Sequence, residues 1–202
     1  MINTFIPRSP HDAVTNVVYR IGMARLERPV FYLCPVALRF DIGGRWDLAL
    51  KILHAMPGKP DLLLWRTYPD DKPKPDDGLL DKFCAICGIP DPDETTMVSH
   101  DDECSGHTLD HCWRLKDQRL DAKALFGEIA RAELGGFTEF AGTVFLFDTV
   151  HDTLFFFYDD RGLDVAARSV DTLSPLYKQF DQHILAYDRA RIDGIFLPNI
   201  RT

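Results

Sequence analysis

The sequence lacks the short motifs that most often identify an enzyme. It contains no glycine-rich phosphate loop, no Gly-x-Ser-x-Gly elbow for a serine nucleophile and no His-Glu-x-x-His metal motif. No stripe of lysine and arginine favours nucleic acid, so we expect no nucleic-acid partner. No apolar run approaches the length of a membrane span, so we expect no membrane partner either.

The sequence also lacks a secretory signal and an even number of cysteines. Its first residues, MINTFIPRSPHDAV, show no basic cluster followed by an apolar stretch and a small-residue cleavage site. We therefore expect a cytoplasmic protein. Five cysteines would be reduced in that compartment, and their odd number argues against a closed set of disulfides.

The composition is that of a folded globular protein. The chain has 202 residues, of which 46% are apolar and 27% charged, which is enough to bury a core without disulfides or metals. This length suits one domain better than two, so we predict a single domain over residues 1–202. Residues 69–112 are expected to form an acidic, partly irregular segment of it, because prolines interrupt the regular patterns there.

Apolar spacing predicts both helices and strands. Ser9 followed by Pro10 is typical of a helix start, and alternating apolar residues predict a strand over residues 35–42. Residues 88–106 are predicted to be irregular. Further strands are predicted at residues 61–68, 107–115, 143–149, 153–159 and 163–168. Further helices are predicted at residues 45–56, 79–87 and 121–134, and from Asp171 onward.

These elements together predict an α+β fold. A mainly antiparallel sheet, with a three-stranded meander near its C-terminal end, would be packed by helices that include a C-terminal helix. The helix at residues 45–56 would bury Trp46, Leu50 and Leu53. The C-terminal helix would bury one face, formed by Leu173, Leu176, Tyr177, Phe180, Ile184 and Tyr187.

The acidic residues are concentrated in one part of the chain. The net charge is −8, yet residues 70–112 hold 12 acidic and 3 basic residues, a charge of −9, and the rest of the chain carries about +1. Such a segment repels nucleic acid and attracts a basic partner. The alternative is a solvated, mobile loop without a partner.

The stretch YDDRGL joins two of the predicted strands. Asp159 suits the first position of a type I turn, because its side chain can bond the turn backbone. Gly162 suits a left-handed position, because it has no Cβ. Turn chemistry does not explain Asp160 and Arg161, so the hairpin is either a turn alone or a turn that presents Arg161. An internal partner for Arg161 could be Asp188.

Four cysteine and histidine residues have the spacing of a zinc site. Three thiolates and one imidazole in a C-x2-C, 16-residue, C-x2-H arrangement suit tetrahedral zinc of the structural kind. The competing interpretation is a set of buried core cysteines, because residues 79–87 also have helical apolar spacing. We therefore predict no cofactor, with zinc as the alternative. The four residues are Cys84, Cys87, Cys104 and His107.

The last part of the sequence resembles a known family. FYDDRGLDVAARSVDTLSPLYKQFDQHILAYDRARIDGIF is similar to the bacterial family catalogued as domain of unknown function 3885, in which a strand ending in Tyr-Asp-Asp-Arg-Gly precedes Tyr-Asp-Arg and Ile-Asp. Here these are residues 158–162, 187–189 and 192–193. The upstream stretches ALRFDIG and TVFLFDTVHDTLFFF also resemble the family, and we match no family pattern to residues 69–112. The resemblance implies a small bacterial cytosolic protein and assigns no catalytic residue.

These observations favour a binding protein over an enzyme. We predict an immunity protein that neutralises a toxin, because many toxins are basic nucleases and an acidic inhibitor would be steered to them. The alternative is a zinc-binding regulator, or an enzyme built on the Cys/His cluster or the Asp160 and Arg161 hairpin. The sequence does not indicate an oligomeric state. The expected interface residues are Asp70, Asp71, Asp76, Asp77, Asp101, Asp102, Glu103, Asp160 and Arg161.

Overall fold

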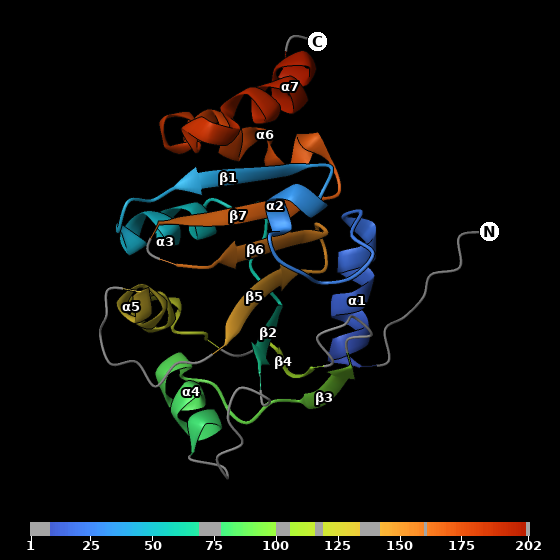
Figure 1. Cartoon of the computed structure of the whole chain (residues 1–202), viewed down its shortest axis with the longest axis vertical. Helices are drawn as coiled ribbons and strands as arrows, with labels where there is room; N and C mark the ends of the chain where they lie inside the picture. The colour runs from blue at the N-terminus through green and yellow to red at the C-terminus, as the bar shows by residue number, and fades with distance from the viewer. Residues whose placement is uncertain are drawn as a thin grey trace, which may run out of the picture.

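A single antiparallel sheet organises the protein (Figure 1). The computed structural model describes residues 9–68, 78–99, 106–115, 119–133, 142–159 and 161–200. The strands within these ranges are β1 (Ala37–Asp41), β2 (Leu62–Thr67), β3 (Glu94–Ser99), β4 (His107–Arg114), β5 (Thr143–Asp148), β6 (Thr153–Phe157) and β7 (Gly162–Ala167). Their order in the sheet is β1-β7-β6-β5-β2-β4-β3. The neighbouring strands β5, β6 and β7 confirm the predicted meander.

Helices pack on the sheet and along its β1 edge, which confirms the α+β class. Ser9 caps the first helix as predicted, because its hydroxyl accepts the N–H of Asp12 at 3.1 Å. No helix in the described ranges is long and apolar enough to cross a membrane. The helices are α1 (Pro10–Arg20), α2 (Val30–Leu33), α3 (Trp46–His54), α4 (Leu79–Cys87), α5 (Ala122–Glu133), α6 (Val170–Gln179) and α7 (Arg189–Ile200).

The face of the sheet toward α4 and α5 is apolar. Phe126 of α5 stacks on Phe155 of β6 with 5.6 Å between ring centroids, and Phe83 of α4 stacks on Trp65 of β2 at 4.2 Å. Helix α3 packs against α5 on this side. Burial of each such aromatic side chain stabilises the fold by roughly 1.5–3 kcal/mol, so this layer holds much of the core.

The opposite, more polar face has charged side chains on either side of two central phenylalanines and is covered by α1 and α2 (Figure 1). Side chains alternate along a strand, so the pairing register decides which residues share this face. Arg39, Asp164 and Phe156 are aligned across β1, β7 and β6. Phe145 of β5 stacks on Phe156 at 4.7 Å, and Arg66 of β2 follows on the same side. Charged and aromatic side chains therefore meet on this face.

Three predictions of regular structure were wrong in detail. Residues 88–106 contain β3, an edge strand whose mostly polar sequence hides its pairing with β4. Helix α3 buries Leu53 as predicted, together with Leu48 and Ile52, whereas Trp46 and Leu50 are only partly buried.

The third difference is that the predicted C-terminal helix is not continuous. After α6 the chain forms two short 3-10 turns, Asp181–His183 and Ala186–Asp188, before α7. Between them the chain pairs with the outer edge of β1, where the N–H of Leu185 donates to the carbonyl of Arg39 at 2.9 Å. An unpaired strand edge favours such pairing, and it leaves Tyr187 86% exposed.

Candidate functional site

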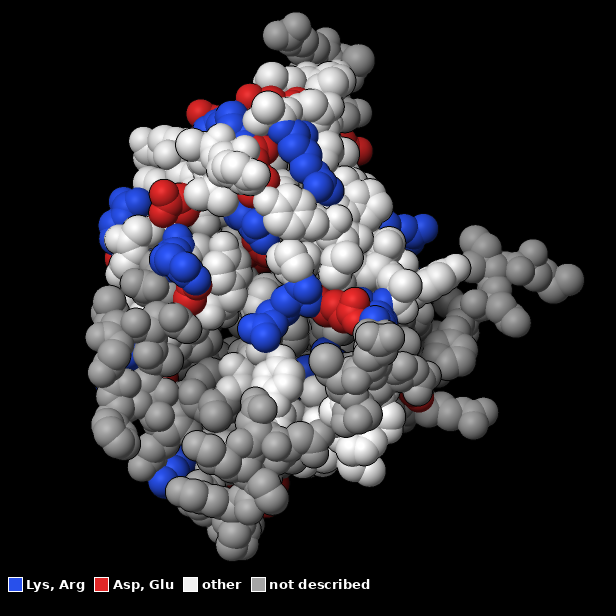
Figure 2. All heavy atoms as spheres, in the orientation of Figure 1, with Lys and Arg blue, Asp and Glu red and all other residues white. Residues whose placement is uncertain are grey.

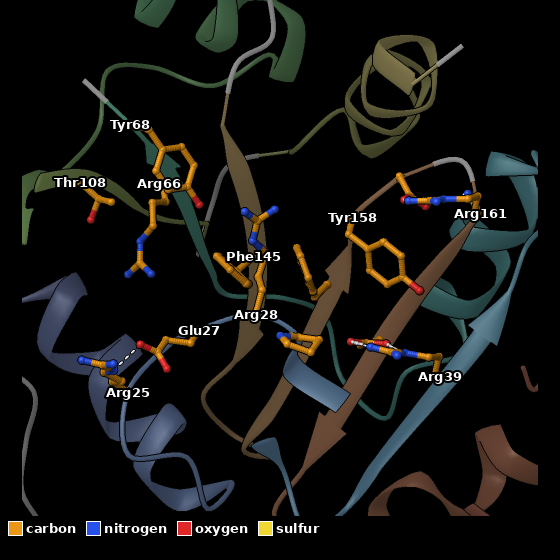
Figure 3. Close-up of a pocket in the computed structure, with 14 residues that line it drawn as sticks. Arg25, Glu27, Arg28, Arg39, Arg66, Tyr68, Thr108, Phe145, Tyr158 and Arg161 are labelled. Atoms are coloured by element: carbon orange, nitrogen blue, oxygen red, sulfur yellow. Dashed lines mark hydrogen bonds and ion pairs between the residues drawn. The ribbon is translucent and has the colours of Figure 1, made fainter. Parts of the chain in front are cut away.

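A pocket opens on the polar face of the sheet, bordered by the segment that joins α1 to α2. Its volume is about 760 Å³, and Figure 2 shows basic side chains around the hollow in the middle of this face. Five arginines and three acidic residues are among the described residues that line it. The arginines are Arg25, Arg28, Arg39, Arg66 and Arg161, and the acidic residues are Glu27, Asp159 and Asp164 (Figure 3).

Strand pairing places two of these arginines opposite aspartates. Arg39 of β1 lies opposite Asp164 of β7, and Arg66 of β2 lies opposite Asp110 of β4. Directly opposed residues have Cβ atoms about 5 Å apart, within reach of a bidentate ion pair. A charged residue inside an apolar strand, as in LLLWRT, is the signal by which the sequence could have indicated these pairs.

Arg39 is held by two buried carboxylates and by aromatic rings. Its Nε and Nη2 donate to Asp164 at 2.7 and 3.0 Å, and its Nη1 lies 3.5 Å from Asp188. The hydroxyl of Tyr32 donates to Asp188 at 3.0 Å, and the Tyr32 ring centroid lies 4.8 Å from the guanidinium. Asp188 therefore pairs with Arg39, and the pairing of Asp188 with Arg161 that the sequence suggested is wrong. Burial raises the pKa of Asp164, and Arg39 opposes that rise.

Arg66 is the second buried guanidinium at the pocket. Its Nε and Nη2 each donate to Asp110 at 2.7 Å, and its Nη1 donates to the carbonyl of Leu26 at 2.7 Å. Burial opposes ionisation of Asp110, but hydrogen bonds from Arg66 and His11 outweigh it and lower its pKa. Arg66 thus ties the loop after α1 to the sheet and shapes the pocket wall.

His11 extends this pair toward the first turn of α1. Its Nε2 lies 3.5 Å from Asp110, and this partner raises the pKa of His11 although burial lowers it. A raised folded-state pKa stabilises the fold fully below about pH 6.5, and this gain is lost as the pH rises through the folded-state value.

We therefore expect His11→Gln to lower the free energy of unfolding by roughly 1 kcal/mol more at pH 5.5 than at pH 8.5. Urea unfolding of both proteins across this range measures the difference. An equal loss at both pH values would contradict the coupling between His11 and Asp110.

Three arginines of the pocket are exposed: Arg25, which pairs with Glu27, Arg28 and Arg161. Arg28 is exposed, lies 5.9 Å from the ring centroid of Tyr68, and has no carboxylate partner among the described residues. Arg161 bonds Asp159 through its Nε at 2.9 Å, yet its side chain remains 80% exposed. Sequence reasoning identified Arg161 and missed Arg28, whose role depends entirely on where the loop folds.

The YDDRG hairpin is a turn that also presents Arg161. Asp159 Oδ1 accepts the N–H groups of Arg161 and Gly162 at 2.8 and 3.2 Å, which confirms the predicted turn role of Asp159. Gly162 is not in the left-handed region; it begins β7 and pairs with Asp41. Glycine is required there because a Cβ would lie 2.7 Å from the Phe40 carbonyl oxygen and would meet the Tyr158 hydroxyl.

The proposed zinc ligands are not brought together among the described residues. Cys84 and Cys87 are buried in α4, and burial raises the pKa of both thiols. The Sγ of Cys84 donates to the carbonyl of Pro90, which also accepts the indole N–H of Trp113 near the end of β4. His107 begins β4, about 20 Å earlier along that strand. No group of three potential metal-ligating side chains occurs in the described ranges.

Several residues proposed from the sequence lie outside the residues that the structure describes. Cys104 of the zinc set is one of them, and Asp160 of the hairpin is another. The remaining ones are the acidic residues Asp70, Asp71, Asp76, Asp77, Asp101, Asp102 and Glu103.

Comparison with protein families gives a match, which spans all the strands of the described sheet. A family model described as a domain of unknown function, DUF3885, matches residues 20–188. The match includes all five arginines of the pocket. Neither the curated proteins nor the solved structures yield a match. Because the family model covers most of its length, the chain belongs to the family of domain of unknown function 3885.

Proposed function

We propose that this chain is a bacterial, cytoplasmic binding protein that holds an anionic group of its ligand in the arginine-lined pocket. The observation that carries the proposal is the gathering of five arginines around one hollow in a chain whose net charge is −8. The planar guanidinium donates two parallel hydrogen bonds to a carboxylate or a phosphate. Arg28 and Arg161 are the exposed arginines that such a ligand would contact, since Arg28 has no carboxylate partner among the described residues and the Arg161 side chain is 80% exposed.

The chemistry of the lining favours binding over catalysis. Its three acidic residues are each paired with an arginine: Glu27 with Arg25, Asp159 with Arg161 and Asp164 with Arg39. Each of these carboxylates therefore already binds a guanidinium. Burial raises the pKa of Tyr158, so its hydroxyl stays protonated at neutral pH. The described lining therefore offers hydrogen-bond donors and no activated nucleophile.

We expect Arg28→Ala and Arg161→Ala each to weaken binding of inorganic phosphate about tenfold, because each removes a charge-assisted hydrogen bond. Isothermal titration at low, fixed ionic strength measures the affinity. Arg131→Ala is the matched control: Arg131 is an exposed arginine of α5, on the apolar side of the sheet, and its loss changes the net charge equally.

An equal loss of affinity in the Arg131 variant would show that phosphate responds only to overall charge. No measurable binding of phosphate, or of citrate as a carboxylate probe, to the unsubstituted protein would also refute the proposed pocket function.

A second candidate function is toxin neutralisation by direct binding. The observation that favours it is the charge of −9 over residues 70–112, which would attract a basic toxin. Affinity capture from the native host would recover a basic partner that is toxic when expressed alone. Replacing the seven acidic interface residues named above by Asn or Gln should abolish capture. Retained capture by that variant, or recovery of the protein alone while such toxins are expressed, would contradict this role.

A further inference from the structure

The floor of the pocket is aromatic, which narrows the class of ligand. Four aromatic side chains line it: Phe145 and Phe156 are buried, at 1% and 2% exposure, and Tyr68 and Tyr158 present more of their rings to the pocket. Phe145 and Phe156 stack on each other, and Tyr158 lies 5.4 Å from Phe156 between ring centroids. The ligand that fits this floor therefore carries a flat, apolar group as well as an anion.

The open arginine lies beside this floor. Figure 3 shows Arg28 projecting into the space between Tyr68 and Tyr158. Its guanidinium lies over the Tyr68 ring, 5.9 Å from the ring centroid, and has no carboxylate partner among the described residues. Arg161 stands at the rim near Tyr158, with its exposed side chain oriented by Asp159. An anionic group bound here would be adjacent to the aromatic rings.

The charge and the volume of the pocket indicate which anions with a flat group would fit it. The side chains lining the pocket carry five positive and three negative charges, and a phosphate monoester supplies nearly two negative charges and three acceptor oxygens. The volume of about 760 Å³ lies in the range of small-molecule sites. The net charge of −8 disfavours a long polyanion such as RNA.

We propose that the ligand is a nucleotide, with its phosphate at Arg28 and Arg161 and its base against the rings of Tyr68 and Tyr158. This inference rests on the proposed anion-binding function. It adds that the bound anion is a phosphate that carries a nucleoside. Aromatic side chains and arginine are the two features that proteins combine to bind a base and its phosphate.

The test compares AMP with its parts at one ionic strength by isothermal titration. We expect AMP to bind at least tenfold more tightly than inorganic phosphate or ribose 5-phosphate, and adenosine to bind more weakly than AMP. Arg28→Ala should weaken binding of both AMP and phosphate. Tyr158→Leu should weaken AMP about tenfold and leave phosphate unchanged, because it removes a ring that faces the base. GMP, CMP and UMP complete the set of probes.

Saturation-transfer NMR on the unsubstituted protein gives a second readout that does not depend on variants. The H8 and H2 protons of AMP should receive more saturation than its ribose protons, because the base lies on the rings.

Three results would overturn the inference. If phosphate binds and AMP binds no more tightly, the anion pocket stands and the nucleotide is wrong. If neither binds, both proposals fail. If a single-stranded RNA ten nucleotides long binds far more tightly than AMP, the site belongs to a polymer instead of a mononucleotide.

Discussion

Arg39→Ala is expected to lower the free energy of unfolding by about 3–5 kcal/mol, because it removes the only cation that the structure places between two buried carboxylates in the described residues. Asp164 is fully buried and Asp188 is 5% exposed, so neither can recover hydration when Arg39 is lost. Urea unfolding at pH 7, followed by circular dichroism, measures the change.

Two further variants separate the ion pair from simple packing. Arg39→Met combined with Asp164→Leu should recover part of the loss, because it removes one of the two carboxylates together with the cation. The recovery stays partial, because Asp188 loses its cation and the N–H of Phe31 loses the Asp164 acceptor at 3.0 Å. Asp188→Asn should change stability by less than about 1 kcal/mol, because Asn can still accept the Tyr32 hydroxyl. If the double variant loses as much free energy of unfolding as Arg39→Ala, the unpaired buried carboxylate is not the cause of the loss.

Gly162→Ala is expected to destabilise the protein by about 2–3 kcal/mol, because the added Cβ overlaps the Phe40 carbonyl of the neighbouring strand. The carbonyl belongs to the sheet and cannot move away as a flexible side chain could. Gly127→Ala is the matched control: a Cβ on Gly127 in α5 meets nothing within 4 Å. That variant should be stabilised by about 0.5–1 kcal/mol, since alanine favours a helix.

A third substitution distinguishes the close approach from a left-handed turn. Asparagine tolerates the left-handed region better than alanine does, so a left-handed Gly162 would make Gly162→Asn the milder change. The observed extended conformation predicts the reverse, because asparagine is larger and the space is limited by Phe40 and Tyr158. Thermal unfolding of the two variants decides between these expectations.

Local patterns predicted elements well where burial follows a simple period. The alternation in ALRFD and the apolar runs of β5 and β6 identified strands, and Ser9 with Pro10 identified the start of α1. Prediction failed where a neighbour decides the structure. The polar sequence of β3 becomes a strand because β4 lies beside it, and the chain after α6 leaves the helix to pair with β1.

The linear sequence was enough to predict the α+β class, the meander, the turn role of Asp159 and the membership in the family of domain of unknown function 3885. These features depend on local periodicity or on a contiguous pattern, which a linear chain displays directly. The pocket could not be predicted in this way, because its arginines are scattered from residue 25 to residue 161. Strand register aligns Arg39 and Arg66 on one face, and the loop after α1 carries Arg28 to their side. Long-range pairing of this kind leaves no local pattern, so it can be found only in the folded chain.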